Sequence, residues 1–438
     1  MTLKISVIGT GYLGVTHAAC MSSMGFQVVG IDIDASKISA LSAGELPFYE
    51  PGLQELLVAE LASGRLTFSD SITSAASADV HFVCVGTPQR SGSLAADLSY
   101  VDSAIDNLAP VIKSGSLVVG KSTVPVGTAE RLLARLQHVN PLLDLAWNPE
   151  FLREGFAVED TLHPNRLVVG VTNDDAEAIL KEVYAQNLAE DVPWIRADLP
   201  TAELVKGAAN SFLATKISFI NAMAEVCEAA GGDVTVLAKA IGYDPRIGSR
   251  FLQAGIGFGG GCLPKDIRSF MARAQELGAD QSLEFLREID AINLRARTRV
   301  IDLVRAELEE NLIGYKIAIL GAAFKPDSDD VRDSPALDIA SQLQAAGAAV
   351  TVHDPKALKS AQLRFPVLNY AESIEECIAE ADLILHLTEW KIYRELDPVK
   401  LIGLVKRPII IDGRNALDRD LWISAGWKFR ALGRKAIN

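Results

Sequence analysis

Short runs of β-branched and other apolar residues alternate with amphipathic segments along the first 170 residues. The runs that we expect to form strands are Lys4–Gly9, Gln27–Asp32, Val80–Gly86, Leu117–Gly120 and Leu167–Val171. Nearly continuous apolar strands that alternate with helical segments are typical of a parallel sheet with helices on both faces. The first part of the chain is therefore predicted to be a doubly wound α/β domain.

The spacing of apolar residues changes from a strand-like to a helical pattern after residue 200. From Thr201 to Ala230, apolar and small residues recur at three- and four-residue spacing up to Gly231–Gly232, which predicts one long helix. Helical patterning continues to about Glu310, and strand-like runs return at Tyr315 in KIAILGAAF, AAVTVHDP, ADLILHLTEW and RPIIIDGRN. We predict two Rossmann-like domains joined by a helical middle region, with domains at 1–200, 201–312 and 313–438.

The predicted long helix carries apolar residues over more of its surface than a helix with one buried face and one solvated face. This surface serves either a core within the chain or a homodimer interface, and we favour the homodimer because a long helix between two domains has much surface to cover.

Composition narrows the classes of function. The 438 residues are 49% hydrophobic and 22% charged, as in a soluble globular protein, and the net charge of −14 argues against nucleic acid or anionic membrane as partners. The N-terminal apolar run is too short and too rich in glycine for a signal peptide, and no 18-residue apolar run occurs, so we expect a cytoplasmic protein. The five cysteines are scattered and the histidines lack paired ligand spacing, so we expect neither a disulfide framework nor a metal site.

A dinucleotide fingerprint follows the first predicted strand. In GTGYLG, Gly9 suits a tight turn, Gly11 allows the backbone to approach a pyrophosphate, and Gly14 allows close packing of helix and strand. Asp32 ends the second predicted strand, near the spacing expected of a carboxylate that binds the adenosine ribose. Since a carboxylate repels a 2′-phosphate and Ile33-Asp34 supplies no arginine, we expect NAD rather than NADP.

The segment GIGFGGGCLPKD, from Gly255 to Asp266, concentrates glycines before a cysteine. A buried cysteine usually acts as a small hydrophobic residue, which fits the other four cysteines. Cys262 differs because it lies in a loop near Lys265, whose charge favours the thiolate. From local chemistry alone, Cys262 is either a nucleophile or another structural cysteine.

Motifs from both ends of the chain occur in the order seen in the UDP-glucose 6-dehydrogenases, and the sequence resembles this branch of the UDP-glucose/GDP-mannose dehydrogenase family over nearly its whole length. The motifs are GTGYLG, PFYEPGL (47–53), VGTP, STVPVGT, NPEFLREG (148–155), ELVKGAAN (203–210), GFGGGCLPKD, GAAFKPDSDDVRDSP (321–335) and IDGRN (411–415). The cysteine loop and NPEFLREG are specific to nucleotide-sugar dehydrogenases, whereas GTGYLG is widespread. One departure is Gly261, where some relatives carry serine.

The resemblance implies a four-electron oxidation of the sugar C6 hydroxyl to a carboxylate, with two NAD consumed. Cys262 is then the nucleophile, and Lys206 and Asp266 serve the first oxidation together with Asn210, which lies one helical turn from Lys206. Hydrolysis of the thioester is given to Glu150 or Glu154, with Thr123 orienting water. Outside this family, most such glutamates and helix-face lysines would be solvated.

The resemblance also implies the binding residues. Those expected at the cofactor are Gly9, Gly11, Tyr12, Leu13, Gly14, Asp32, Lys37, Thr87, Thr123, Glu154, Lys265 and Arg332. Those expected at the UDP-sugar are Glu150, Phe151, Leu152, Lys206, Asn210, Arg246, Phe251, Leu252, Gly259, Phe324, Lys325 and Arg414, with Arg246 reaching the substrate of a partner subunit. The expected substrate is UDP-glucose. GDP-mannose, a UDP-N-acetylhexosamine, or an inactive sensor of NAD and nucleotide sugar are the alternatives.

Overall fold

The computed structural model describes residues 3–435 and divides into two compact units. The first comprises residues 1–209 with 268–278, and the second comprises 210–267 with 279–438. Helix α9 (Leu199–Ala230) and helix α11 (Leu263–Glu276) each contribute residues to both units. The division into domains at 1–200, 201–312 and 313–438 stays a prediction, and its outermost residues, 1–2 and 436–438, lie outside the described residues.

The first unit contains an eight-stranded sheet in the order β3-β2-β1-β4-β5-β6-β7-β8. Its strands are β1 (Lys4–Ile8), β2 (Gln27–Ile31), β3 (Leu66–Ser69), β4 (Val80–Val83), β5 (Leu117–Gly120), β6 (Asp144–Trp147), β7 (Leu167–Gly170) and β8 (Trp194–Ala197). Its other elements are α1 (Tyr12–Ser23), α2 (Ala35–Ser42), α3 (Leu53–Ala62), the 3-10 helix η1 (Ile72–Ser77), α4 (Ser99–Leu108), α5 (Thr128–Val139), α6 (Ala157–Leu162), α7 (Asp174–Val183) and α8 (Ala185–Ala189).

Both faces of the central strands of this sheet are buried, as the unbroken apolar strands predict. Along β5, Leu117 and Val119 belong to one hydrophobic cluster and Val118 belongs to another, because successive strand side chains point to opposite faces. The predicted α/β class is thereby confirmed. The order 3-2-1-4-5-6 of the first six strands is that of a Rossmann fold, with its switch point between β1 and β4.

One pairing differs from the wholly parallel sheet expected. Strands β6 and β7 are antiparallel and share one Cα pair, Trp147 with Gly170. The NPEFLREG segment after β6 is irregular and is followed only by the six-residue helix α6. This segment therefore leaves the carboxyl end of β6 as a loop, where polar side chains are available for chemistry.

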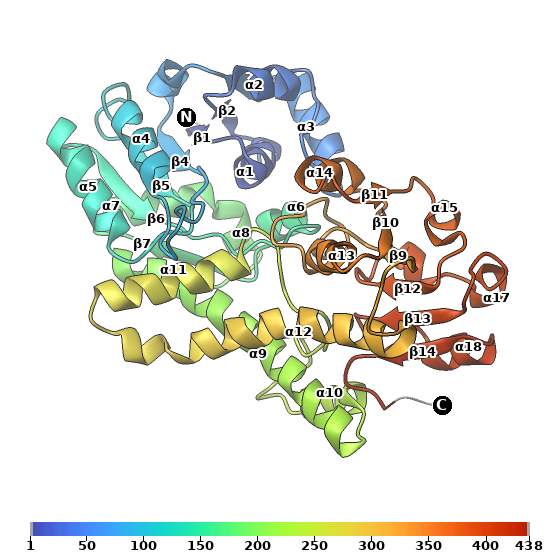
Figure 1. Cartoon of the computed structure of the whole chain (residues 1–438). Helices are drawn as coiled ribbons and strands as arrows, with labels where there is room; N and C mark the ends of the chain where they lie inside the picture. The colour runs from blue at the N-terminus through green and yellow to red at the C-terminus, as the bar shows by residue number, and fades with distance from the viewer. Residues whose placement is uncertain (1–2, 436–438) are drawn as a thin grey trace. The chain divides into compact units, whose positions relative to one another are not determined.

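The second unit contains a parallel six-stranded sheet in the order β11-β10-β9-β12-β13-β14, again a Rossmann order (Figure 1). Its strands are β9 (Lys316–Leu320), β10 (Ala349–His353), β11 (Asn369–Tyr370), β12 (Leu383–His386), β13 (Ile409–Asp412) and β14 (Lys428–Ala431). Its helices, besides its share of α9 and α11, are α10 (Val234–Gly242), the 3-10 helix η2 (Asp280–Leu283), α12 (Phe285–Leu308), α13 (Pro335–Ala345), α14 (Leu358–Arg364), α15 (Ile374–Ile378), α16 (Lys391–Arg394), α17 (Pro398–Leu401) and α18 (Arg419–Ser424).

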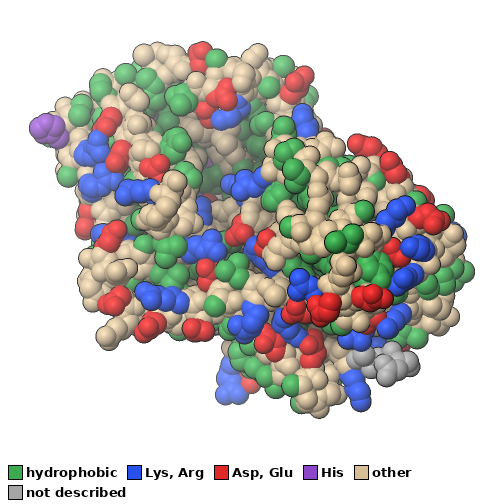
Figure 2. Space-filling model, in the orientation of Figure 1, with side chains coloured by type: hydrophobic (Ala, Val, Ile, Leu, Met, Phe, Trp, Pro, Cys, Tyr) green, Lys and Arg blue, Asp and Glu red, His purple; other side chains and the backbone are tan. Residues whose placement is uncertain are grey.

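The predicted long helix is α9, which begins two residues before the expected start and ends at Ala230 as expected. Within the second unit, α12 packs against it through Ser218, whose hydroxyl donates to the Ile289 carbonyl at 2.8 Å. Ion pairs join Arg295 to Glu225 and Arg299 to Glu228. Side chains of both charges are interspersed over the face seen in Figure 2.

Candidate active site

The glycine turn after β1 has the shape that its sequence predicts. Gly9 has a φ of +90°, a conformation that favours glycine, and an added Cβ at Gly14 would lie 1.8 Å from the Gly9 carbonyl oxygen. At Gly11, by contrast, an added Cβ would meet nothing within 4 Å. The turn therefore packs closely where helix meets strand and leaves open space where a pyrophosphate would approach, while Leu13 packs against the core.

Asp32 lies at the end of β2 and is held by several donors. Its carboxylate accepts from the Thr10 N–H at 2.8 Å and from the Lys37 ammonium at 2.9 Å. Burial opposes ionisation of Asp32, but the Lys37 contact and the N–H groups of Thr10 and Asp34 outweigh it and lower the pKa of Asp32. The structure thus brings Lys37 and Asp32 together. The sequence had predicted an Asp32 carboxylate with no cation beside it, but the Lys37 ammonium pairs with it.

The two loops that follow β4 and β5 are joined by their hydroxyl residues. The Thr87 hydroxyl donates to the Thr123 carbonyl at 2.8 Å, and the Ser122 hydroxyl donates to the Val85 carbonyl at 2.7 Å. Both loops lie at the carboxyl edge of the parallel strands, the edge at which such folds bind ligands.

The NPEFLREG loop is anchored at its start by a buried polar cluster. Asn148 is 1% exposed and accepts from the Lys121 ammonium at 2.8 Å and from the Tyr184 hydroxyl at 2.6 Å. Burial lowers the pKa of Lys121 to about 8. Sequence reasoning missed Lys121 and Tyr184, because their meeting with Asn148 depends on tertiary structure.

Within this loop, Glu150 meets the start of α9. The Lys206 ammonium lies 2.9 Å from Glu150 Oε1, while Glu150 Oε2 accepts from the Leu152 N–H at 2.8 Å. The ring of Phe151 lies under two cations, with its centroid 5.6 Å from Lys206 Nζ and 3.8 Å from Arg166 Cζ. Glu150, Phe151, Leu152 and Lys206, predicted as substrate residues, therefore form one cluster.

In the second unit, Cys262 is exposed and directly precedes α11, whereas the other four cysteines are buried. A helix N-terminus stabilises a thiolate. Asp266, one turn into α11, has a 2% exposed side chain, accepts from the Asn210 amide at 2.7 Å and pairs with Lys265 at 2.6 Å. Three predicted site residues thus form a second cluster, and two of them, Lys265 and Asp266, lie close in sequence to the cysteine.

The glycines before Cys262 make room for the loop that follows β9. An added Cβ at Gly259 would lie 2.2 Å from the Asp333 carbonyl oxygen, and one at Gly261 would overlap the Arg332 guanidinium. The ring of Phe324 lies against Gly260, and Lys325 Nζ lies 5.7 Å from that ring's centroid. Gly261, where some relatives carry serine, is therefore matched here by an arginine that fills the space.

Polar residues missed by sequence reasoning hold the same loop. Asn293, fully buried in α12, accepts from the Phe258 N–H at 2.7 Å and donates to its carbonyl at 3.0 Å. Arg297, one turn later, contacts the Phe258 carbonyl and pairs with Asp333 and Asp338. The signal in the sequence was weak, since one asparagine and one arginine on an amphipathic helix look like its solvated face.

The remaining predicted substrate residues lie in three different environments. Arg414 donates to the carbonyls of Leu387, Gly257 and Phe324 at 2.8, 3.1 and 3.0 Å. Leu252 is buried, and Phe251 is 38% exposed with a φ of +64°. Arg246 has an 87% exposed side chain and pairs with Asp244. Arg246 therefore contacts neither Arg414 nor the loop carbonyls that Arg414 binds.

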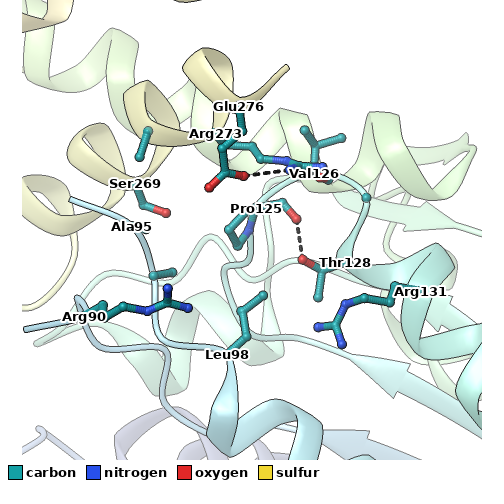
Figure 3. A pocket seen from close by; sticks show the side chains of 13 residues that line it. Arg90, Ala95, Leu98, Pro125, Val126, Thr128, Arg131, Ser269, Arg273 and Glu276 are labelled. Carbon is teal, nitrogen blue, oxygen red and sulfur yellow. Dashed lines mark hydrogen bonds and ion pairs between the residues drawn. The ribbon is translucent and has the colours of Figure 1, made fainter. Parts of the chain in front are cut away.

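A pocket of about 290 Å³ lies in the first unit beside the STVPVGT loop (Figure 3). Figure 3 shows Arg90 and Arg131 pointing toward it from opposite sides, and Arg273 also lines it. Arg131 pairs with Asp102 at 2.8 Å and Arg273 with Glu276 at 2.7 Å, so much of its positive charge is already compensated. No site residue predicted from the sequence lines this pocket.

Across residues 3–435, no group of three or more His, Cys, Asp or Glu side chains is placed to hold a metal ion. Over the same residues, no helix is both long and apolar enough to cross a membrane.

A Rossmann sheet with a glycine turn after β1 and a carboxylate after β2 is the arrangement with which dinucleotide-dependent oxidoreductases bind their cofactor. Family models match residues 3–188 (UDP-glucose/GDP-mannose dehydrogenase family, NAD binding domain), 200–295 (the central domain) and 318–419 (the UDP binding domain).

The chain is 41% identical to the UDP-glucose 6-dehydrogenase of Rhizobium meliloti, over 99% of this chain and 100% of that protein. It also resembles two solved structures. The UDP-glucose dehydrogenase of Pyrobaculum islandicum superposes with a TM-score of 0.90 at 36% identity, covering 99% of this chain and 98% of that one. The UDP-D-ManNAc dehydrogenase of Pyrococcus horikoshii superposes with a TM-score of 0.87 at 27% identity, covering 99% of each chain. The chain belongs to the UDP-glucose/GDP-mannose dehydrogenase family, and NAD is its cofactor.

Proposed function

We propose that this protein oxidises UDP-glucose at C6 to UDP-glucuronate. The observation that carries the proposal is the exposed thiol of Cys262 at the start of α11, within a glycine-rich loop. Full-length similarity to UDP-glucose 6-dehydrogenases at about 40% identity supports UDP-glucose over GDP-mannose and UDP-N-acetylhexosamines. NAD, when bound, accepts a hydride in each of two successive oxidations.

In the first oxidation, C6 loses a hydride and its hydroxyl loses a proton. We assign the proton to Asp266 and the stabilisation of the developing oxyanion to the Lys206 ammonium. The contacts of Asp266 with Asn210 and Lys265, and of Lys206 with Glu150, hold both groups in defined positions. Such fixed dipoles and charges are what electrostatic catalysis requires.

The second oxidation needs a nucleophile, because an aldehyde does not release its C–H hydrogen as a hydride to NAD until a nucleophile has added to its carbonyl. The Cys262 thiolate forms a C–S bond to C6 and gives a thiohemiacetal, which loses the second hydride and its hydroxyl proton and becomes a thioester. Water then adds to the thioester carbonyl and releases the carboxylate and the thiol. Glu150 or Glu154 would take the proton from this water, with Thr123 orienting it.

Measuring NADH absorbance with UDP-glucose, GDP-mannose and UDP-N-acetylhexosamines tests the proposal. We expect two NADH per UDP-glucose and a much higher kcat/KM for UDP-glucose than for the others. A higher value for another nucleotide sugar would reassign the substrate. Tight binding of UDP-glucose without any NADH would instead identify a sensor that has lost catalysis.

We also propose a homodimer through α9, in a reducing compartment such as the cytoplasm, where the thiol of Cys262 stays reduced. Phe212, Phe219 and Val226 are 66%, 47% and 56% exposed, and their seven-residue spacing places them on one face of the helix. Light scattering is expected to give twice the chain mass. Phe219→Glu should shift the protein to a monomer, whereas Phe285→Glu, at another exposed phenylalanine of the same unit, should not.

A further inference from the structure

A buried carboxylate with no role in the chemistry lies between two predicted cofactor segments of the first unit. Glu50, in the PFYEPGL motif, is 3% exposed. It accepts a hydrogen bond from the hydroxyl of Tyr12, in the glycine turn. It also accepts from the N–H groups of Gly155 and Ala157, at 2.6 and 2.7 Å, at the far end of the NPEFLREG loop.

The three donors reach Glu50 from segments more than 140 residues apart in sequence. Gly155 has a φ of +79°, a left-handed conformation that turns the chain directly after Glu154. Tyr12 is also held from the side, since its ring centroid lies 5.0 Å from that of Phe48, two residues before Glu50. The Glu50 loop therefore fixes Tyr12 and the backbone next to Glu154 together.

Charge makes this arrangement sensitive to substitution. Burial, and then the Glu50 carboxylate itself, raise the pKa of Tyr12 well above its ordinary value, so the phenol stays protonated and donates. Both oxygens of Glu50 are occupied by donors, as a buried carboxylate requires. A glutamine at this position would turn an NH₂ group toward one of the three donors and leave that donor without an acceptor.

We propose that Glu50 is a positioning residue for the cofactor, which holds Tyr12 and the Glu154 segment in the spacing that NAD requires. The proposal rests on the proposed function in taking Tyr12 and Glu154 as residues at the NAD site. It predicts a defect in cofactor affinity that is larger than any defect in chemistry. Removing Glu50 should therefore raise the KM for NAD by more than it lowers kcat, which falls only as far as Glu154 is displaced from the water that it would activate.

The direct test is titration of NADH fluorescence with the full chain and no sugar nucleotide, so that it does not depend on the substrate. We expect Glu50→Gln to weaken NADH binding about tenfold, as for the loss of one or two hydrogen bonds to a charged group. Tyr12→Phe should weaken it less. The double variant should be no worse than Glu50→Gln alone, because both changes break the same contact.

Glu60→Gln is the matched control. Glu60 is 5% exposed and lies in the same unit. It forms an ion pair with Arg65 at 2.9 Å and accepts a hydrogen bond from the Ser22 hydroxyl, so this substitution also removes a buried carboxylate that has partners. We expect Glu60→Gln to lower thermal stability as Glu50→Gln does, yet to leave NADH affinity unchanged. Equal NADH affinity in Glu50→Gln and wild type, or an equal loss in Glu60→Gln, would overturn the proposal.

The two proposals fail in different ways. If the wild type binds NADH but reduces no NAD with any nucleotide sugar, the proposed oxidation is wrong while the Glu50 result still stands. If the wild type turns over UDP-glucose but Glu50→Gln lowers kcat and leaves the KM for NAD unchanged, the positioning role is wrong and the oxidation stands.

Discussion

The ammonium group of Lys206 lies 2.9 Å from Glu150, and the side chains of the two residues are only 7% and 13% exposed. This ion pair joins the first turns of α9 to the NPEFLREG loop. The desolvation of two charges offsets much of their attraction, so such a pair adds little net stability. Removing one charge, however, takes away a close opposite charge that offsets the desolvation of the other.

The Lys206–Glu150 pair predicts an asymmetry between single and double variants. Glu150→Gln and Lys206→Met should each lower the free energy of unfolding by about 3 kcal/mol, while the double variant should lose less than either. Urea denaturation measures all three. Additive losses in the double variant would contradict a coupled pair.

Cofactor choice is predicted to depend on Asp32 and Lys37 together. Asp32→Ala should relax the preference for NAD over NADP by roughly ten- to hundredfold in kcat/KM, since it removes a hydrogen bond from the ribose and a repulsive charge. The same variant frees Lys37, whose ammonium now pairs with Asp32, to contact a 2′-phosphate.

The matched control for this prediction is the double variant Asp32→Ala with Lys37→Ala. This double variant should have a lower kcat/KM with NADP than Asp32→Ala alone, because it lacks the Lys37 ammonium that would contact the 2′-phosphate. Similar kcat/KM values for NAD and NADP in the wild type would contradict the role given to Asp32.

Much of the fold follows from local pattern. The apolar strands β1, β2, β4, β5 and β7 are buried on both faces and were predicted from the sequence. The edge strands were not, because little apolar sequence marks them: β8 (Trp194–Ala197) has no buried residue, and β11 has two residues. β6 (Asp144–Trp147), three-quarters buried, was also missed, since its four residues run directly into the NPEFLREG loop.

Only part of the candidate site could be predicted from the sequence. Glycines and a strand-end carboxylate carry their function in local backbone geometry, so Gly9, Gly14 and Asp32 were accessible from spacing alone. The residues that hold the loops in place, such as Glu50, Lys121 and Asn293, act through contacts distant in sequence. A single sequence contains no record of those contacts, and the pairing of Lys37 with Asp32 was missed for the same reason.

The buried carboxyl of Glu203 predicts a pH dependence of stability. It accepts from the N–H groups of Gly127 and Ala129 at the start of α5, each at 2.7 Å. Burial raises its pKa to about 7, although these hydrogen bonds oppose the rise. The folded state therefore binds a proton more tightly than the unfolded state, so the stabilisation is complete below pH 4.5 and is lost as the pH rises through 7.

A rise of this size corresponds to about 3 kcal/mol of unfolding free energy across that window. Glu203→Gln removes the titration. The difference in unfolding free energy between wild type and Glu203→Gln should therefore change in favour of the variant as the pH rises from 4.5 to 7. A difference that is constant with pH would contradict the raised pKa.

Arg414 is predicted to affect both binding and stability. Its guanidinium braces three loops through the carbonyls of Gly257, Phe324 and Leu387, so Arg414→Ala leaves three acceptors without a donor. We expect the KM for UDP-glucose to rise more than kcat falls, together with a lower melting temperature. Arg414→Lys, which keeps the charge but not the geometry, should recover less than half of the loss in affinity. An unchanged KM in Arg414→Ala would place this residue outside the substrate site.

The sharpest prediction concerns Cys262, because the proposed chemistry needs its sulfur only after the first hydride has left C6. Cys262→Ala should abolish formation of the acid and still permit a slow first oxidation, since Lys206, Asp266 and the glycine turn are intact. Cys262→Ser should accumulate an ester that hydrolyses slowly, because an alkoxide is a poorer leaving group than a thiolate.

Rapid-quench mass spectrometry of Cys262→Ser should detect the mass of the sugar-nucleotide acyl group on the protein. Cys227→Ala, which removes a buried thiol of the same unit, is the control and should give wild-type stoichiometry. If Cys262→Ala produces UDP-glucuronate at the wild-type rate with two NADH per sugar, no covalent intermediate is required. The second hydride must then leave from the hydrated aldehyde, and the glycine-rich loop would serve only to bind the substrate.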